Sequence, residues 1–90
     1  MSNDMKNQIE ELYKTLVSLT STEDCKDFFE DLCTYKEIEA MAQRLQAAKL
    51  LSDGETYEKI IEKTGISSAT LSRVNKCVKY GNGYKKYCKK

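Results

Sequence analysis

Apolar residues recur at helical spacing along the chain, and no stretch alternates apolar and polar positions for long enough to indicate a strand. Near the N-terminus, successive apolar positions lie 4, 3, 4 and 3 residues apart, at Met5, Ile9, Leu12, Leu16 and Leu19. This narrow seam is the kind that helices use to pack against one another. The pattern predicts an all-α protein whose first helix runs from Asn3 to about Leu19.

Capping residues predict two further helices in the first half of the chain. Ser21 or Thr22 is suited to cap a second helix, because its side-chain oxygen can accept from a free backbone N–H. The expected buried residues of that helix are Phe28, Phe29 and Leu32. Thr34 and Glu37 form a capping box for a third helix, which is expected to end near Ser52. Its apolar face is expected to contain Ile38, Met41, Leu45 and Ala48, with Leu51 as a further candidate.

Glycines and hydroxyl residues divide the second half of the chain. Thr56 is expected to cap a fourth helix over residues 57–64, and Ser67 a fifth that runs to about Tyr80. The run Gly81-Asn82-Gly83 predicts a left-handed helix terminus. The basic tail, residues 81–90, is expected to be a frayed helix or disordered.

The fourth and fifth helices have the apolar spacing of a helix-turn-helix. With Gly65 as the turn residue, Ile60 lies five positions before it, and Ile66, Leu71 and Val74 lie one, six and nine positions after it. Two short helices crossing at such a turn would bury these residues as a small wedge of core. A glycine suits the turn because a Cβ would strain its backbone conformation.

The charges are divided unevenly along the chain, although the net charge is only +1. Residues 1–40 carry four basic and ten acidic side chains, whereas residues 41–90 carry eleven basic and four acidic ones. No acidic residue follows Lys63. An oriented nucleic-acid binder is expected to show this asymmetry, because its basic half attracts phosphate and its acidic half does not.

Composition argues against several classes of function. The chain has no histidine and no glycine-rich phosphate loop, and its four cysteines form no C-x-x-C pair. We therefore expect neither an enzyme nor a metal site. No apolar run is long enough to span a membrane, and there is no signal-like segment, so free cysteines and a cytoplasmic location are expected.

The fifth helix begins with short polar side chains, which would let it lie deep in the major groove of double-stranded DNA. Side chains near this end would face base edges, and basic residues along the same segment would contact phosphates. The predicted DNA-binding residues are Lys63, Ser67, Ser68, Ala69, Thr70, Ser72, Arg73 and Lys76.

The runs "LCTYKEIEAMAQRL" and "GISSATLSR" resemble the Trp repressor superfamily, most closely its TrpR-like YerC/YecD family of small bacterial proteins. The resemblance implies an intertwined, all-helical homodimer of five to six helices per chain, which acts as a transcriptional repressor. It divides the single domain 1–90 into dimerising helices (1–33), a central helix (34–53), the helix-turn-helix (56–80) and the basic tail.

The same resemblance implies a site for a small effector, with tryptophan or another amino-acid-like corepressor as the candidate ligand. Its residues would be Arg44, Arg73 and Cys77, with Thr34 contributed by the partner chain, and the two arginines would flank the ligand. Two departures count against tryptophan. Cys77 replaces a serine that grips the ligand's amino group, and Val74 replaces a glycine that leaves room for the ligand.

Simpler interpretations, without a ligand, stay open for Arg44 and Arg73. Arg44 could be a surface residue paired with a nearby glutamate, and Arg73 could contact phosphate and nothing else. The alternative to a DNA-binding regulator is a helical homodimer that binds another protein through its acidic face. That alternative gives no reason for the absence of acidic residues after position 63.

Overall fold

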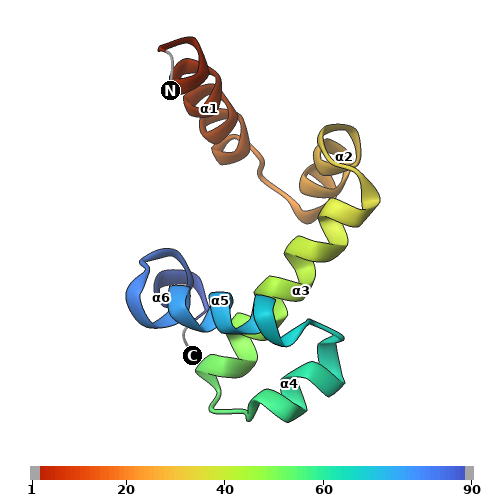
Figure 1. The fold of residues 1–90 in the computed structure, drawn as a ribbon. Helices are drawn as coiled ribbons and strands as arrows, with labels where there is room; N and C mark the ends of the chain where they lie inside the picture. The colour runs from red at the N-terminus through yellow and green to blue at the C-terminus, as the bar shows by residue number, and fades with distance from the viewer. Residues whose placement is uncertain (1–2, 89–90) are drawn as a thin grey trace. The chain divides into compact units, whose positions relative to one another are not determined.

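The computed structural model describes residues 3–88, and within that range its regular structure is entirely α-helical (Figure 1). The helices are α1 (Asn3–Val17), α2 (Thr22–Leu32), α3 (Tyr35–Ser52), α4 (Tyr57–Thr64), α5 (Ser68–Tyr80) and α6 (Gly83–Tyr87). The all-α prediction is confirmed. The chain forms two compact units, one up to Tyr35 and one from Lys36 onward.

In the first unit, α1 ends two residues before the expected Leu19. The backbone N–H groups of Ser18 and Leu19 donate to the carbonyls of Thr15 and Leu16, three residues back, which tightens the last turn and ends the helix. Ser21 caps α2 as expected, because its hydroxyl oxygen accepts from the backbone N–H of Asp24 at 3.0 Å.

The apolar residues of α1 and α2 have no core within this chain. Within one chain no residue of either helix is buried, so the burial expected for the apolar side chains of α2 is not supplied by this chain alone. Leu32 is 49% exposed, while Phe28 and Phe29 are half-buried and meet edge to face with ring centroids 6.5 Å apart. The seam of α1 is likewise uncovered, and Met5 and Leu12 count among its exposed residues.

The core lies in the second unit and is built around the helix-turn-helix. The four apolar residues predicted from their spacing around Gly65 are all buried, and Ala47, Ala48 and Cys88 complete the cluster. The structure corrects the expected core face of α3, because Leu45 is 44% exposed while Ala47 is fully buried. The two adjacent alanines of α3 belong to the same buried cluster as Leu71 and Val74 of α5.

Caps and a glycine define the limits of α4 and α5 as the sequence predicts. The hydroxyl oxygens of Thr56 and Ser67 accept from the backbone N–H groups of Lys59 and Thr70. Gly65 ends α4 in the left-handed region, at φ 75°, and its N–H donates to the carbonyl of Ile61. Few residues other than glycine adopt this conformation without strain.

The C-terminal segment differs from its prediction at Gly81, whereas its tail adopts the helical one of the two expected states. Gly81 is extended rather than left-handed, and it is needed because an added Cβ would lie 2.7 Å from the carbonyl oxygen of Cys77. The expected basic tail forms the helix α6, which packs beside α5 (Figure 1). Tyr84 and Cys88 anchor α6 to the core, whereas its lysines stay exposed. Residues 89 and 90 of the predicted tail lie outside the described residues.

We predict that Gly65→Ala lowers the free energy of unfolding by about 1–2 kcal/mol, the usual penalty for an L-residue in the left-handed region. A Cβ there would meet its nearest atom at 3.5 Å, so the penalty arises from the backbone and not from a clash. Gly83→Ala is the matched control, because nothing lies within 4 Å of the added Cβ. Urea denaturation at equal protein concentration should leave the control unchanged or more stable, and equal effects of the two variants would contradict the assignment.

Candidate nucleic-acid interface

The exposed end of α5 carries most of the side chains predicted to bind DNA. Ser67 stands at the cap, and Ser68, Ala69 and Ser72 are exposed. Arg73 and Lys76 are exposed further along the same helix. The structure therefore brings these residues together on one helix with short side chains at its N-terminal end. Thr70 is the exception, since it is half-buried.

Two hydroxyl groups at the start of α5 are joined in a chain of hydrogen bonds. The backbone N–H of Thr70 donates to the Ser67 hydroxyl oxygen at 3.2 Å. The Ser67 hydroxyl in turn donates to Oγ1 of Thr70 at 2.9 Å. The Thr70 hydroxyl hydrogen is then the end of the chain and can be donated to a further acceptor. Because each bond polarises the next, this hydroxyl is a stronger donor than an isolated one.

Arg44, Thr70 and Arg73 line one pocket of about 420 Å³ between α3 and α5. Both guanidinium groups are purely donors, and the Thr70 hydroxyl supplies another donor. Among residues 3–88, neither arginine has an ion-pair partner, so the structure does not support the interpretation of Arg44 as an intrachain pairing residue. The pocket therefore concentrates positive charge beside the start of α5.

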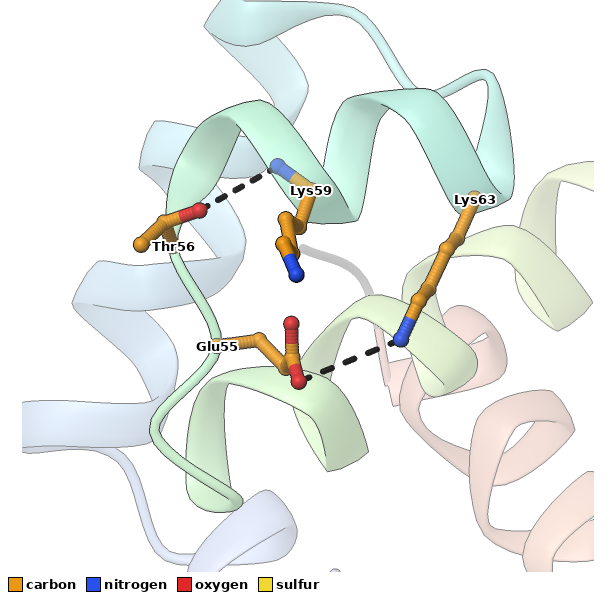
Figure 2. Close-up of polar contacts among 4 residues, drawn as sticks. All are labelled: Glu55, Thr56, Lys59 and Lys63. Atoms are coloured by element: carbon orange, nitrogen blue, oxygen red, sulfur yellow. Dashed lines mark hydrogen bonds and ion pairs between the residues drawn. The ribbon is translucent and has the colours of Figure 1, made fainter.

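Lys63 lies in the last turn of α4, away from the helix that carries the other predicted residues. Its Nζ is 3.9 Å from Oε1 of Glu55, in the loop before α4 (Figure 2). Figure 2 shows the Lys59 side chain pointing toward the same carboxylate. The long, partly exposed pair is weak, so Lys63 can leave Glu55 to meet a phosphate at little cost.

Three residues of the predicted effector site, Arg44, Arg73 and Cys77, belong to the second unit, and they line two different pockets. Arg44 and Arg73 share the pocket, whereas Cys77 lines a separate apolar pocket of about 320 Å³ with Gly81, Gly83 and Tyr84. Thr34 belongs to the first unit. Val74 is 3% exposed and is part of the core.

Gln43 is a positioning residue that sequence reasoning missed. Its Nε2 donates to the carbonyl oxygen of Thr64 at 2.9 Å, which ties α3 to the turn before α5. The signal in the sequence is a polar residue four positions before the buried Ala47, and so on the core side of α3. The bond also satisfies a carbonyl at the end of α4 that would otherwise have no partner inside its helix.

The described part of the chain has neither a metal-binding cluster nor a membrane-spanning helix. Across residues 3–88, no three His, Cys, Asp or Glu side chains gather closely enough to hold a metal ion. Within the same range, no helix combines the length and the apolar character needed to cross a bilayer.

Comparison with known proteins places this architecture in a family. The model of the Trp repressor protein family matches residues 7–90. The uncharacterized protein YerC of Bacillus subtilis (strain 168) is 48% identical over 75 residues, which make up 83% of this chain and 72% of YerC.

Two solved structures share the fold. A TrpR-like protein from Eubacterium eligens ATCC 27750 has a TM-score of 0.86 at 45% identity, covering 94% of this chain and 90% of its own. A candidate Trp repressor from Staphylococcus aureus has a TM-score of 0.85 at 38% identity, covering 96% and 90%. The chain belongs to the Trp repressor family, in its TrpR-like YerC branch, a family of DNA-binding regulators and not of enzymes.

Proposed function

We propose that the protein is a sequence-specific DNA-binding regulator that represses transcription. The observation that carries the proposal is the surface of α5, where short polar side chains at the N-terminal end are followed by exposed Arg73 and Lys76. No acidic residue follows position 63 to repel phosphate. Short side chains allow the backbone of a helix to approach base edges closely, and flanking cations hold it in place.

In this arrangement the N-terminal end of α5 enters the major groove. Ser68, Ala69 and Thr70 face base edges, and Ala69 offers a methyl group for contact with thymine. Phosphates are held from the flanks of the groove by Ser67, Ser72, Lys63, Arg73 and Lys76. The weak pairing of Lys63 with Glu55 holds that lysine near the turn until it exchanges the carboxylate for a phosphate.

A homodimer would explain why the apolar side chains of the first unit are exposed in a single chain. The helices α1 and α2 bury no residue within one chain, although each carries large apolar side chains. Packing against the same helices of a second copy would remove those side chains from water. Two copies of α5 could then contact successive major grooves, about 34 Å apart, and bind a palindromic site.

We predict that Leu12→Lys converts the dimer to monomers, because a charge would replace a central residue of the α1 seam. Sedimentation velocity measures the change. Glu11→Lys is the control, since it alters the charge of an exposed neighbour outside the seam and should leave the dimer intact. A Leu12→Lys variant that stays dimeric would remove α1 from the interface.

Selection of bound sequences from a random pool of DNA duplexes tests the function directly. A palindromic sequence is expected to be the most enriched. We predict that Thr70→Asp abolishes binding to that duplex, because a carboxylate at the groove faces phosphates and base acceptors. The fold should survive, since an acid in the first turn of a helix is favourable. Thr22→Asp, in the first turn of α2, adds the same charge far along the chain and should bind normally. A gel shift in which Thr70→Asp binds like the wild type would reject the docking arrangement.

The alternative function, a dimeric module that binds another protein, predicts a different result. The selection would then enrich no sequence, and Thr70→Asp would change nothing. The basic surface of α5 favours DNA as the partner. Binding of a protein through the acidic half of the chain would not explain why α5 lacks acidic residues.

For the effector we predict that calorimetry with L-tryptophan at millimolar concentration gives no binding heat. Among residues 3–88, those that line the Arg44–Arg73 pocket carry donors for a carboxylate but no carboxylate for the ammonium group of an amino acid. Cys77, which stands where the family resemblance implies a serine bound to the ligand's amino group, lines another pocket. A saturable heat that disappears in Arg73→Gln would contradict this prediction and restore tryptophan as corepressor.

A further inference from the structure

We propose that Gln43 of α3 determines how sharply the protein discriminates between DNA sequences, without touching a base itself. Its side-chain amide holds the turn of the helix-turn-helix and thereby fixes the angle at which α5 meets the groove. The inference rests on the proposed function and deepens it, because it assigns specificity to a positioning residue that lies outside the helix-turn-helix.

The first argument is the reach of the hydrogen bond that Gln43 makes. Its Nε2 donates to the carbonyl oxygen of Thr64 at 2.9 Å, across 21 positions of the sequence. The capping bonds of Thr56 and Ser67 each join residues three positions apart. Such local bonds fix the end of their own helix but not its angle to a neighbour. The bond of Gln43 fixes one element relative to another.

The second argument is the set of bonds around the acceptor. The Thr64 hydroxyl donates to the carbonyl oxygen of Ile60 at 2.7 Å and accepts from the backbone N–H of Ile66 at 3.2 Å. With the bond from Gln43, Thr64 is therefore joined to α3, to α4 and to the residue just before the cap of α5. All three bonds are partly buried, so water competes with them less than at an open surface.

The third argument is the closeness of the amide to the turn. A Cβ added to Gly65 would lie 3.5 Å from Nε2 of Gln43, which is an ordinary packing distance. The amide therefore lies against the left-handed residue as well as being bonded to the residue before it. A rotation of the turn would break this bond and would displace Ser68 and Ala69 together, since both follow within the next turn of chain.

These observations separate the two parts of DNA binding. Attraction to the phosphate backbone depends on the charges of the protein, and Gln43 has none. Base readout depends on the exact placement of short side chains at the start of α5. Loss of the bond should therefore reduce specificity and leave general affinity for DNA intact.

The test compares affinity for the duplex enriched by selection with affinity for a duplex of unrelated sequence. Gln43→Met keeps the length of the side chain but removes the donor, so binding to the enriched duplex should weaken about three- to tenfold, the range for one hydrogen bond. Affinity for the unrelated duplex and the dependence on salt should not change, because no charge is lost. Gln46→Met is the matched control at an exposed position of α3 and should behave as the wild type.

Single base changes along the half-site distinguish positioning from direct contact. If Gln43 acts through the turn, Gln43→Met should reduce discrimination at every base pair that Ser68, Ala69 and Thr70 read. A loss confined to one base pair would show that Gln43 itself touches the DNA, and the inference would be wrong.

Gln43→Glu makes the same bond dependent on pH. Near pH 7 the introduced carboxylate has no hydrogen to donate to the Thr64 carbonyl, so discrimination should be lost. Toward about pH 5 part of it becomes protonated, because partial burial raises the pKa of a carboxyl group, and discrimination should recover. The wild type has no histidine and should change little over this range. It is the reference at each pH, since both proteins share Glu39, Arg44 and Lys63, the charged residues nearest to this pair along α3 and α4.

The outcomes separate the inference from the proposed function. If Gln43→Met discriminates between the duplexes as the wild type does, or weakens binding to both equally, the inference fails and the proposed function stands. If urea denaturation shows that Gln43→Met is unfolded, Gln43→Glu decides, and absence of recovery at low pH overturns the inference. A wild type that prefers no duplex would overturn both.

Discussion

The left-handed turn at Gly65 is the constraint on which the arrangement of the second unit depends. It ends α4 and starts the turn that aims α5, and the amide of Gln43 holds the adjoining Thr64 carbonyl at 2.9 Å. Ile66 follows immediately and is buried, so the turn is fixed from both sides. A groove-binding helix needs this rigidity, because a small error in its angle displaces every base contact along it.

The core also bears on the pocket between α3 and α5. Ala47 and Ala48 are fully buried and belong to the same cluster as Leu71 and Val74 of α5. Arg44 lies one turn before them on the same face of α3 and so reaches the pocket beside Thr70. Larger residues at the alanines would separate the helices and the guanidinium groups together.

Sequence periodicity and capping predicted the helix-turn-helix well, because both signals are local. Ile60 and Leu71 were identified by counting from Gly65, and Ser67 by its place before a helix. The features that sequence patterns did not predict depend on contacts between helices. The burial of Ala47 has no periodic signal, and the basic composition of the C-terminus left a frayed helix and disorder equally open, because the contact of Tyr84 with the core is not a local feature. In the pocket, Arg44 lies 26 positions from Thr70 and 29 from Arg73, so no local pattern could pair them, and only the family resemblance had paired the two arginines.

Glycine is required at position 65 and at position 81 for two different physical reasons. At position 65 the backbone adopts the mirror image of the conformation that L-amino acids prefer, so the requirement is one of handedness. At position 81 the backbone is ordinary and the carbonyl oxygen of Cys77 is too near for a side chain, so the requirement is one of size. A D-amino acid would suit the first position by its chirality alone. Glycine is therefore required before α5 because of backbone handedness and after α5 because of side-chain size.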